Sequence, residues 1–213
     1  MTKFLYIALI FSLALLPSQL HSQQYIPEDE MTDDERETKR KAKIKFSLDN
    51  LNSEHGKSVE RATYFFELMG EEAVSYLLKK LRDKDITQRA KINTIYTMGR
   101  LRENAERAVP ILIPYLKDEH PDVRAVTAKA LGRIKTKNNA AVGGLIHLMF
   151  DDDEWVRKCA IFSLNRISTP RAKEALREYR DLQKKKLDKS LTHNLSNIDK
   201  ETAPHKKQGA ASQ

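Results

Sequence analysis

The chain contains few of the residues on which disulfide-stabilised, turn-rich or metal-binding proteins depend. Its 213 residues include one cysteine, Cys159, which excludes an intramolecular disulfide and a cysteine-rich zinc site. Seven glycines and seven prolines are too few for a turn-dense fold built from β-strands. The composition therefore predicts an all-α protein.

Sequence signatures of catalysis are missing as well. The six histidines are scattered, and none has another His or a Cys at metal-ligand spacing. No glycine-rich phosphate loop and no Gly-x-Ser-x-Gly motif occur. The acidic run from Asp151 to Glu154 could attract a divalent ion, but consecutive acids at a helix start are more typical of capping. We expect no catalytic residue, no metal and no cofactor.

Positive and negative charges are close to balanced. The sequence has 38 basic and 30 acidic residues, which gives a net charge of +8. This excess falls short of the dense positive field of a dedicated nucleic-acid-binding protein, so nucleic acid is not the expected partner.

The N-terminus has the pattern of a secretory signal peptide. Lys3 gives a positive start, residues 4–16 form an apolar run, Pro17 breaks it, and a polar stretch ends at the small residue Ser22. Because a membrane-spanning helix needs roughly 20 apolar residues, this run is short for a permanent anchor. We expect cleavage of residues 1–22 and an exported protein, periplasmic or secreted, without a transmembrane span; an uncleaved membrane anchor is the alternative.

Two polar segments flank the central part of the chain. Residues 23–58 carry an acidic block followed by a basic block and few apolar side chains, which is typical of a charged disordered linker. Residues 184–213 are polar and lack apolar periodicity, so we expect a disordered tail.

Between these segments, a pattern of two helices recurs about every 33 residues. The end of the first helix occurs three times, and each copy is 33 positions from the last. The copies read Met98-Gly99-Arg100-Leu101, Leu131-Gly132-Arg133-Ile134 and Leu164-Asn165-Arg166-Ile167. Such a period indicates stacked units that bury their apolar faces only against one another.

The periodicity predicts four helix pairs in residues 59–183. In the second helices the apolar residues fall on one face, as Val109, Leu112 and Leu116 do. In the first helices the inward positions include small residues such as Ala130 and Cys159, which we expect to be buried. The expected pairs are 59–69 with 72–82, 86–101 with 107–117, 122–134 with 140–150, and 154–167 with 171–183.

These residues resemble the short HEAT repeat named after phycobilisome lyases. The resemblance rests on Asp122-Val123-Arg124 leading to Leu131-Gly132-Arg133, and on Glu154-Trp155-Val156-Arg157 leading to Leu164. It covers residues 59–183 and implies an α-solenoid of about four HEAT-type helix pairs. Tetratricopeptide repeats have a similar period of about 34, but their Trp, Leu-Gly and Tyr spacing is absent from the first helices.

Basic and acidic turns alternate along the repeats. Turns that follow the first helices are basic, and stacking in register would place Arg100, Arg133 and Arg166 in a row on one edge. Turns that follow the second helices are acidic. Both signs complement helix dipoles, so capping explains them; a basic edge that binds an anionic partner or surface is a compatible alternative.

Three residues near the acidic turns are expected to be structural. Arg124 and Arg157 lie early in their helices and should bond carboxylates and loop carbonyls between repeats, because the guanidinium fork suits that geometry. Trp155 should fill the space between repeats.

The second helices carry another candidate surface. In the resembling family they line the concave face, where the residues between core positions would form a partly apolar strip. These residues are Tyr76, Ile111, Tyr115, His147 and Leu148. The alternative is that they pack against neighbouring repeats.

The sequence therefore predicts an exported, non-catalytic scaffold that binds a protein partner on its concave face. A chromophore-lyase-like enzyme or subunit, which the resemblance permits, is one alternative. An anionic-surface binder that acts through the basic edge is another.

Overall fold

The computed structural model describes residues 31–202, with side chains through residue 192. The predicted signal peptide and the last residues of the predicted tail lie outside this range. The chain divides into two compact units, residues 1–46 and 47–213, which are described separately. No helix in the described part combines the length and apolarity needed to cross a membrane.

The first unit contributes most of a helix that the linker prediction did not include. Helix α2 (Asp33–Asn50) occupies much of the stretch that we expected to be disordered. A capping box starts it, because the Glu35 carboxylate accepts the Thr32 N–H at 2.8 Å while Thr32 Oγ1 accepts the Glu35 N–H at 3.3 Å. Glu37 and Lys41 pair one turn apart at 3.4 Å. The acidic block therefore lies at the positive end of a helix dipole, and the linker prediction is corrected over residues 33–50.

The second unit is an all-α array of helix pairs, as predicted. The first helices of the pairs are α3 (Gly56–Met69), α5 (Gln88–Arg100), α7 (Pro121–Ile134) and α9 (Glu154–Ile167). Their partners are η1 (Gly70–Glu72) with α4 (Ala73–Leu81); η2 (Arg102–Ala108), α6 (Val109–Leu112) and η3 (Ile113–Lys117); α8 (Asn139–Leu148); and α10 (Pro170–Thr202).

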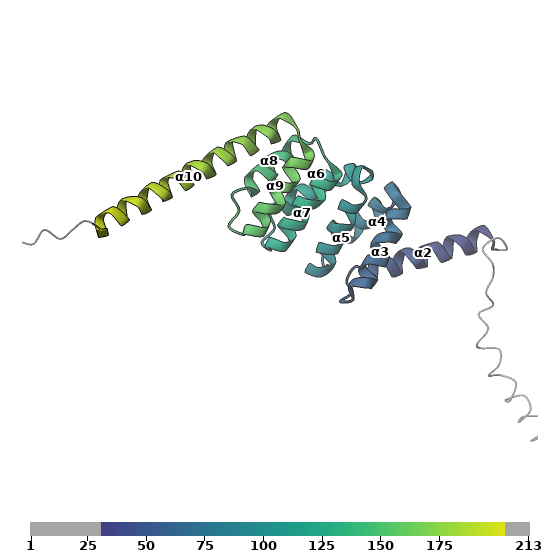
Figure 1. The fold of residues 1–213 in the computed structure, drawn as a ribbon. Helices are drawn as coiled ribbons and strands as arrows, with labels where there is room; N and C mark the ends of the chain where they lie inside the picture. Colours follow the sequence, from purple (N-terminus) through teal and green to yellow (C-terminus); the bar gives the residue numbers. More distant parts are fainter. Residues whose placement is uncertain (1–30, 203–213) are drawn as a thin grey trace, which may run out of the picture. The chain divides into compact units, whose positions relative to one another are not determined.

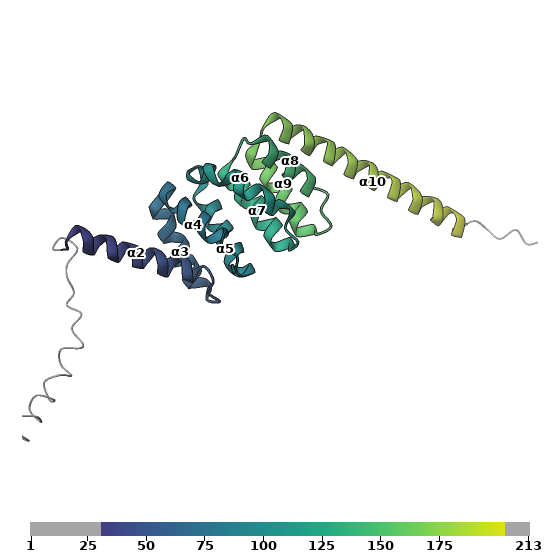
Figure 2. The same ribbon diagram turned by 180° about the vertical axis from the view of Figure 1, so that it is seen from behind.

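The helices of the array form two layers (Figure 1). Helices α3, α5, α7 and α9 lie side by side in sequence order, and each contacts the next. Helix α4, the η2–α6–η3 segment and α8 form the second layer, which is also visible from behind (Figure 2). Equivalent side chains of the first helices therefore fall into rows.

The core lies between the layers and follows the predicted faces. Val109, Leu112 and Leu116 are buried on the second-layer side. Ala130 and Cys159 are buried on the first-layer side, which confirms the expectation for small residues there. Burial raises the pKa of the Cys159 thiol, so this cysteine stays protonated and inert at neutral pH.

The second element of the second pair is less regular than predicted. Instead of one α-helix over 107–117, the chain forms 3₁₀ turns on either side of the short helix α6. Pro110 and Pro114 each lie near the start of one of these pieces, and each removes an N–H that a continuous α-helix would need.

Helix α10 extends well beyond the predicted end at residue 183. It continues to Thr202, so the disordered-tail prediction is corrected for residues 184–202. The stretch after Gln183 is rich in Lys and Leu, which favour helix, and Pro204 is the first proline after Pro170.

Candidate partner-binding surface

The first helices approach one another unusually closely at two glycines. A Cβ atom built on Gly99 would lie 2.7 Å from Ala130 Cα, and one built on Gly132 would lie 2.7 Å from Ser163 Cα. Glycine therefore permits backbone contact between α5 and α7, and between α7 and α9. The arginine that follows each of these glycines reaches back to the preceding first helix, Arg100 to Glu67 on α3 and Arg133 to the Tyr96 ring on α5.

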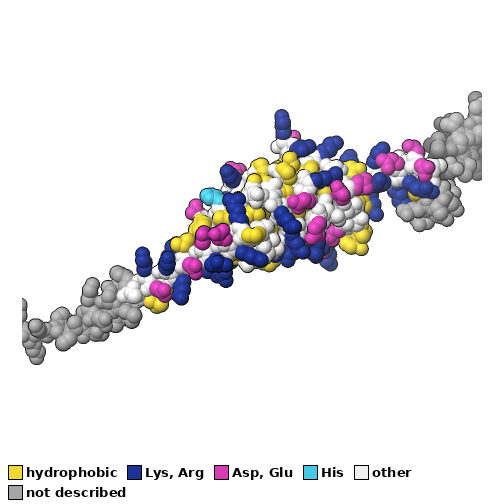
Figure 3. Space-filling model, turned by 90° about the horizontal axis from the view of Figure 1, so that it is seen from above, with side chains coloured by type: hydrophobic (Ala, Val, Ile, Leu, Met, Phe, Trp, Pro, Cys, Tyr) yellow, Lys and Arg dark blue, Asp and Glu magenta, His cyan; other side chains and the backbone are white. Residues whose placement is uncertain are grey.

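The structure brings Arg100, Arg133 and Arg166 together on this face. They line a hollow of about 400 Å³ at the C-terminal ends of α5, α7 and α9. The other lining residues are Gly99, Arg102, Lys129 and Phe162. Figure 3 shows Lys and Arg side chains gathered in patches on the surface, with hydrophobic side chains exposed between them. We call the seven lining residues the basic hollow.

The cations of the basic hollow are held mainly by aromatic rings. The Arg133 guanidinium lies 5.0 Å from the centre of the Tyr96 ring, and the Arg166 guanidinium lies 5.6 Å from that of Phe162. Lys129 Nζ lies 5.2 Å from the centre of the Trp155 ring. Cation–π contacts fix these side chains without neutralising them.

Arg100 differs from its equivalents because it has a carboxylate partner. Its Nε and Nη2 donate to the two carboxylate oxygens of Glu67 on α3, and its Nη1 donates to the Tyr96 hydroxyl at 3.2 Å. Among the described residues, neither Arg133 nor Arg166 pairs with a carboxylate in this way. The positive charge of the row is therefore concentrated toward α7 and α9.

On the acidic edge, the main carboxylates are occupied by ion pairs within the array. Lys91 Nζ lies 3.0 Å from Asp118, and Arg124 Nη2 lies 2.8 Å from Asp151. Burial tends to raise the pKa of Asp151, but hydrogen bonds from Arg124 and the Asp153 N–H outweigh it, so the pKa lies below its ordinary value.

Arg124 and Arg157 have the structural contacts that the sequence predicted. Arg124 Nη1 donates to the carbonyls of Asp118 and Glu119, and Arg157 Nη1 donates to those of Asp151 and Asp152. The acidic edge thus combines ion pairs within a helix pair with arginine contacts to the carbonyls of the turns between pairs.

Capping explains the acidic run, and it explains part of the basic edge. Asp153 is the N-cap of α9 and accepts the Val156 N–H at 2.9 Å. Arg166 Nε donates to the Gly132 carbonyl at 3.2 Å, in the last turn of α7. Within the described residues, no such carbonyl contact holds Arg133, which lies over the Tyr96 ring instead. Helix capping therefore does not explain the whole row of arginines.

The strip expected on the second helices is largely taken up by packing. Leu148 is 3% exposed and belongs to the core, because α8 contacts both α9 and α10; it is withdrawn as a surface residue. Tyr115 is partly buried, and its hydroxyl donates to the Leu81 carbonyl at 3.3 Å. Tyr76 and Ile111 are also partly buried, and His147 is exposed.

Exposed aromatic residues on the first helices were not predicted. Trp155 was expected to fill the space between repeats, but it is 55% exposed at the first turn of α9. Phe162, two turns further on, is 50% exposed. Trp155 lies beside Lys129 and Phe162 beside Arg166. The 33-residue alignment of Phe162 with Tyr96 and Lys129 is the sequence signal that could have revealed Phe162 as a surface residue.

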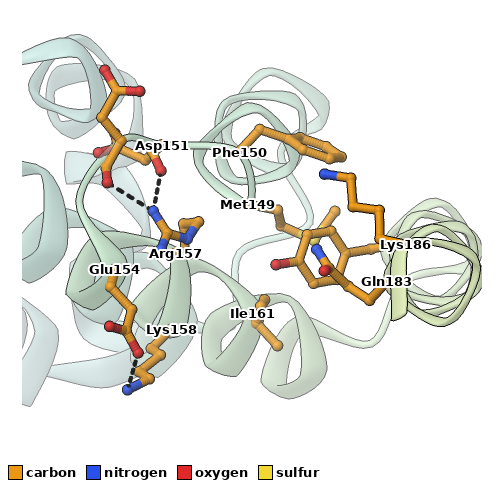
Figure 4. A pocket seen from close by; sticks show the side chains of 11 residues that line it. Met149, Phe150, Asp151, Glu154, Arg157, Lys158, Ile161, Gln183 and Lys186 are labelled. Atoms are coloured by element: carbon orange, nitrogen blue, oxygen red, sulfur yellow. Dashed lines mark hydrogen bonds and ion pairs between the residues drawn. The ribbon is translucent and has the colours of Figure 1, made fainter. Parts of the chain in front are cut away.

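A second hollow, of about 680 Å³, lies at the C-terminal end of the array (Figure 4). Met149 and Ile161 form part of its apolar floor, and Gln183 and Lys186 of α10 face it. Charges of both signs line it, and Glu154 pairs with Lys158 at 2.7 Å. This hollow has no single charge preference, so it offers less specificity than the basic hollow.

Neither hollow has the features of a metal centre. Among the side chains that the structure describes, residues 31–192, no three His, Cys, Asp or Glu are close enough to hold a metal ion.

Comparison with solved structures found several that the chain is similar to. One is the complex of CpcE and CpcF of phycocyanin lyase from Nostoc sp. PCC7120, with 22% identity, a TM-score of 0.55, and coverage of 65% of this chain and 86% of that chain. A designed armadillo repeat protein in complex with the peptide (KR)4 has 17% identity and a TM-score of 0.44, with coverage of 70% of this chain and 74% of that chain. An engineered protein has 20% identity and a TM-score of 0.43, with coverage of 65% of this chain and 68% of that chain. The first likeness supports the fold alone.

Comparison with family models identifies the repeats directly. None of the curated proteins compared with the chain matches it. A model of HEAT repeats matches residues 74–142 and 109–195. Since these residues span more than half of the sequence, the chain belongs to the HEAT-repeat family.

Proposed function

We propose that this protein is an exported, non-catalytic scaffold that binds a protein partner on the face formed by its first helices. The observation that supports this face is the basic hollow, in which Arg133 and Arg166 are ordered by aromatic rings rather than neutralised by carboxylates. This location replaces the strip on the second helices, where Leu148 is buried and Tyr115 is engaged in packing.

The array supports binding because its surface is ordered before a partner arrives. Helix contacts through Gly99 and Gly132 fix the spacing of the row, and cation–π contacts restrain its side chains. Because these side chains are already ordered, binding of a partner costs less conformational entropy in the receptor. The lyase activity named for the CpcE and CpcF complex is not carried over to this chain, because a likeness at 22% identity supports the fold only.

The binding face is tested by charge reversal. The full chain carries Arg133→Glu with Arg166→Glu, and Lys117→Glu on η3 serves as a control because it reverses an exposed charge in the other layer. Proteins captured from an envelope extract of the source cells are compared among the wild-type and both variants. Loss of one captured protein in the double variant, with retention in the control, supports the face; equal capture by all three contradicts it.

Export is tested separately. The intact mass of the protein produced in its own cells should correspond to a chain that begins after Ser22. A mass that retains residues 1–22 in a membrane fraction would favour the uncleaved anchor.

A further inference from the structure

We infer that the basic hollow binds a short acidic segment of the partner protein, in which a glutamate or aspartate stands next to a bulky apolar residue. The inference rests on the proposed function, because it specifies what the partner presents to the first-helix face. Three features support it: the charge of the hollow, the hydrogen-bond donors of its arginines, and the exposed aromatic ring in its lining.

The charge of the hollow selects an anionic occupant. Five of the seven lining residues are cations and none is acidic. Among the described residues, Arg100 is the one of these five that pairs with a carboxylate, that of Glu67. The other four cations therefore repel one another without a counter-charge in the hollow. A carboxylate placed among them relieves that repulsion, whereas a neutral or cationic group does not.

Two arginines present unused hydrogen-bond donors to such an occupant. Arg166 donates from Nε to the Gly132 carbonyl at 3.2 Å, and this bond leaves both terminal nitrogens available. The Arg133 guanidinium lies 5.0 Å from the centre of the Tyr96 ring, and a contact with a ring face uses none of its N–H donors. Guanidinium groups of this kind bind carboxylates through paired hydrogen bonds. Each arginine can bind its own carboxylate, so no particular separation between the two is required.

Phe162 gives the hollow an apolar part. The residue lines the hollow and is 50% exposed, although the Arg166 guanidinium lies 5.6 Å from the ring centre. An occupant that covers the rest of this ring gains free energy from apolar burial in addition to its charge contacts. Exclusion of water also strengthens the hydrogen bonds of the adjacent arginine. A carboxylate with an apolar neighbour therefore fits the hollow better than a carboxylate with polar neighbours.

The surroundings of the hollow favour a short segment over a continuous anionic surface. Glu103 directly follows Arg102, its side chain is 69% exposed, and its Oε1 lies 3.8 Å from Lys135 Nζ. Glu67 is held beside the hollow by Arg100. The face in Figure 3 likewise mixes acidic and basic side chains. A membrane of anionic lipids would meet these carboxylates together with the cations, whereas a segment of a few residues can contact the cations alone.

The test uses synthetic peptides and the full chain. The first peptide, Gly-Glu-Leu-Glu-Glu-Leu-Glu-Gly with an N-terminal fluorescein, places leucine beside glutamate. The second has serine in place of both leucines, and the third has glutamine in place of all the glutamates. Fluorescence anisotropy measures the Kd of each peptide at about 0.1 M salt, where charges in contact are only partly screened.

The wild-type chain is compared with three variants. Arg133→Gln with Arg166→Gln removes two charges and keeps polar side chains, and Arg166→Gln alone replaces it if the double variant loses helicity. Phe162→Ser removes the ring. Lys84→Gln with Lys117→Gln is the matched control, because it removes two exposed charges outside the hollow. Circular dichroism verifies that each variant is folded.

The wild-type chain should bind the leucine peptide at least about threefold more tightly than the serine peptide, and at least about thirtyfold more tightly than the glutamine peptide. Since a charge-assisted contact is worth roughly a tenfold change in Kd, the arginine variant should bind the leucine peptide at least about tenfold more weakly. Phe162→Ser should bind the leucine and serine peptides equally, because the ring that distinguishes them is gone. The lysine control should match the wild-type.

Each other outcome overturns the inference in a recognisable way. Equal binding of the leucine and serine peptides by the wild-type chain excludes the apolar neighbour. Equal weakening by the arginine variant and the lysine control shows that only net charge matters. Tighter binding to phosphatidylglycerol vesicles than to any peptide assigns the hollow to a lipid surface. If the peptides do not bind but capture of the partner from the envelope extract still depends on Arg133 and Arg166, the proposed function stands and only this inference falls.

Discussion

Arg124 and Asp151 form a two-pronged ion pair within one helix pair. The Nε and Nη2 atoms of Arg124 donate to the two carboxylate oxygens of Asp151, each at 2.8 Å. Both side chains are largely buried. Lys91 and Asp118 repeat the link one unit earlier, with the same separation in sequence. The pair therefore joins the start of one first helix to the acidic turn of its own pair.

Replacing Asp151 by Asn should lower the free energy of unfolding by about 2 kcal/mol. The change removes the hydrogen-bonded counter-charge of the largely buried Arg124 guanidinium, and a buried charged group that loses its partner is costly. Urea denaturation followed by circular dichroism measures the effect. Glu154→Gln is the control, because its pair with Lys158 is exposed and should contribute less than about 0.5 kcal/mol. Equal effects of the two substitutions would contradict this role for Asp151.

The stabilising effect of Asp151 should depend on pH in the acidic range. Burial tends to raise its pKa, but the hydrogen bonds it accepts lower the pKa below the ordinary value of about 3.9. A carboxyl group with a lowered pKa in the folded state stabilises fully above its ordinary pKa, and the stabilisation is lost as the pH falls through the folded-state pKa.

The stability difference between the wild-type chain and Asp151→Asn should therefore be constant near neutral pH and shrink below about pH 4. Urea titrations at a series of pH values measure this difference. A difference that grows on acidification would show that the pKa of Asp151 is raised instead.

Replacing Lys135 by Gly should stabilise the array. Lys135 ends α7 in the left-handed region, with φ 59° and ψ 37°, and a non-glycine residue is strained there. Arg102 and Ser168, one repeat away on either side, also have positive φ. We expect a gain of about 0.5–1 kcal/mol, after allowing for the greater freedom of glycine in the unfolded chain.

Thermal unfolding of Lys135→Gly measures this gain. Lys137→Gly is the matched control, since Lys137 is exposed and has no positive φ. The control should be neutral or destabilising, because it relieves no strain and only increases the conformational entropy of the unfolded chain. A lower melting temperature for Lys135→Gly than for the control would show that the backbone at Lys135 is not strained.

The buried part of the fold could be predicted because it repeats. Leu112 and Leu145 occupy equivalent positions 33 residues apart, and both are buried because stacking imposes the same surroundings on each copy. Irregular features depend on single residues instead. Pro110 and Pro114 divide one predicted helix into short pieces, and Thr32 with Glu35 starts a helix in a segment whose composition indicated disorder.

The candidate surface was predictable only in outline. The row of Arg100, Arg133 and Arg166 followed from the repeat, since it depends on position along the helix. Which neighbours each residue meets depends on packing across the row, so Leu148 could not be recognised as buried, nor Trp155 as exposed, from periodicity alone. The Glu67 partner of Arg100 likewise belongs to the first pair, where the repeat pattern is weakest.

Replacing Gly132 by Ala should destabilise the array, although alanine favours helix. A Cβ at this position would lie 2.6 Å from Ser163 Cβ and 2.7 Å from Ser163 Cα, so α7 and α9 must separate. Overpacking of this kind costs about 1–3 kcal/mol. Gly143→Ala on α8 is the matched control, because its nearest neighbour outside α8 is Arg171 Nη2, at 3.4 Å from the built Cβ.

The control should be neutral or stabilising by up to about 1 kcal/mol, as expected when alanine replaces glycine inside a helix. Urea unfolding of both variants therefore gives changes of opposite sign if close contact sets the helix spacing. Since that spacing also fixes the distance between Arg133 and Arg166, Gly132→Ala should weaken capture of the partner protein from the envelope extract. Capture equal to that of the wild-type chain would show that helix spacing does not control recognition.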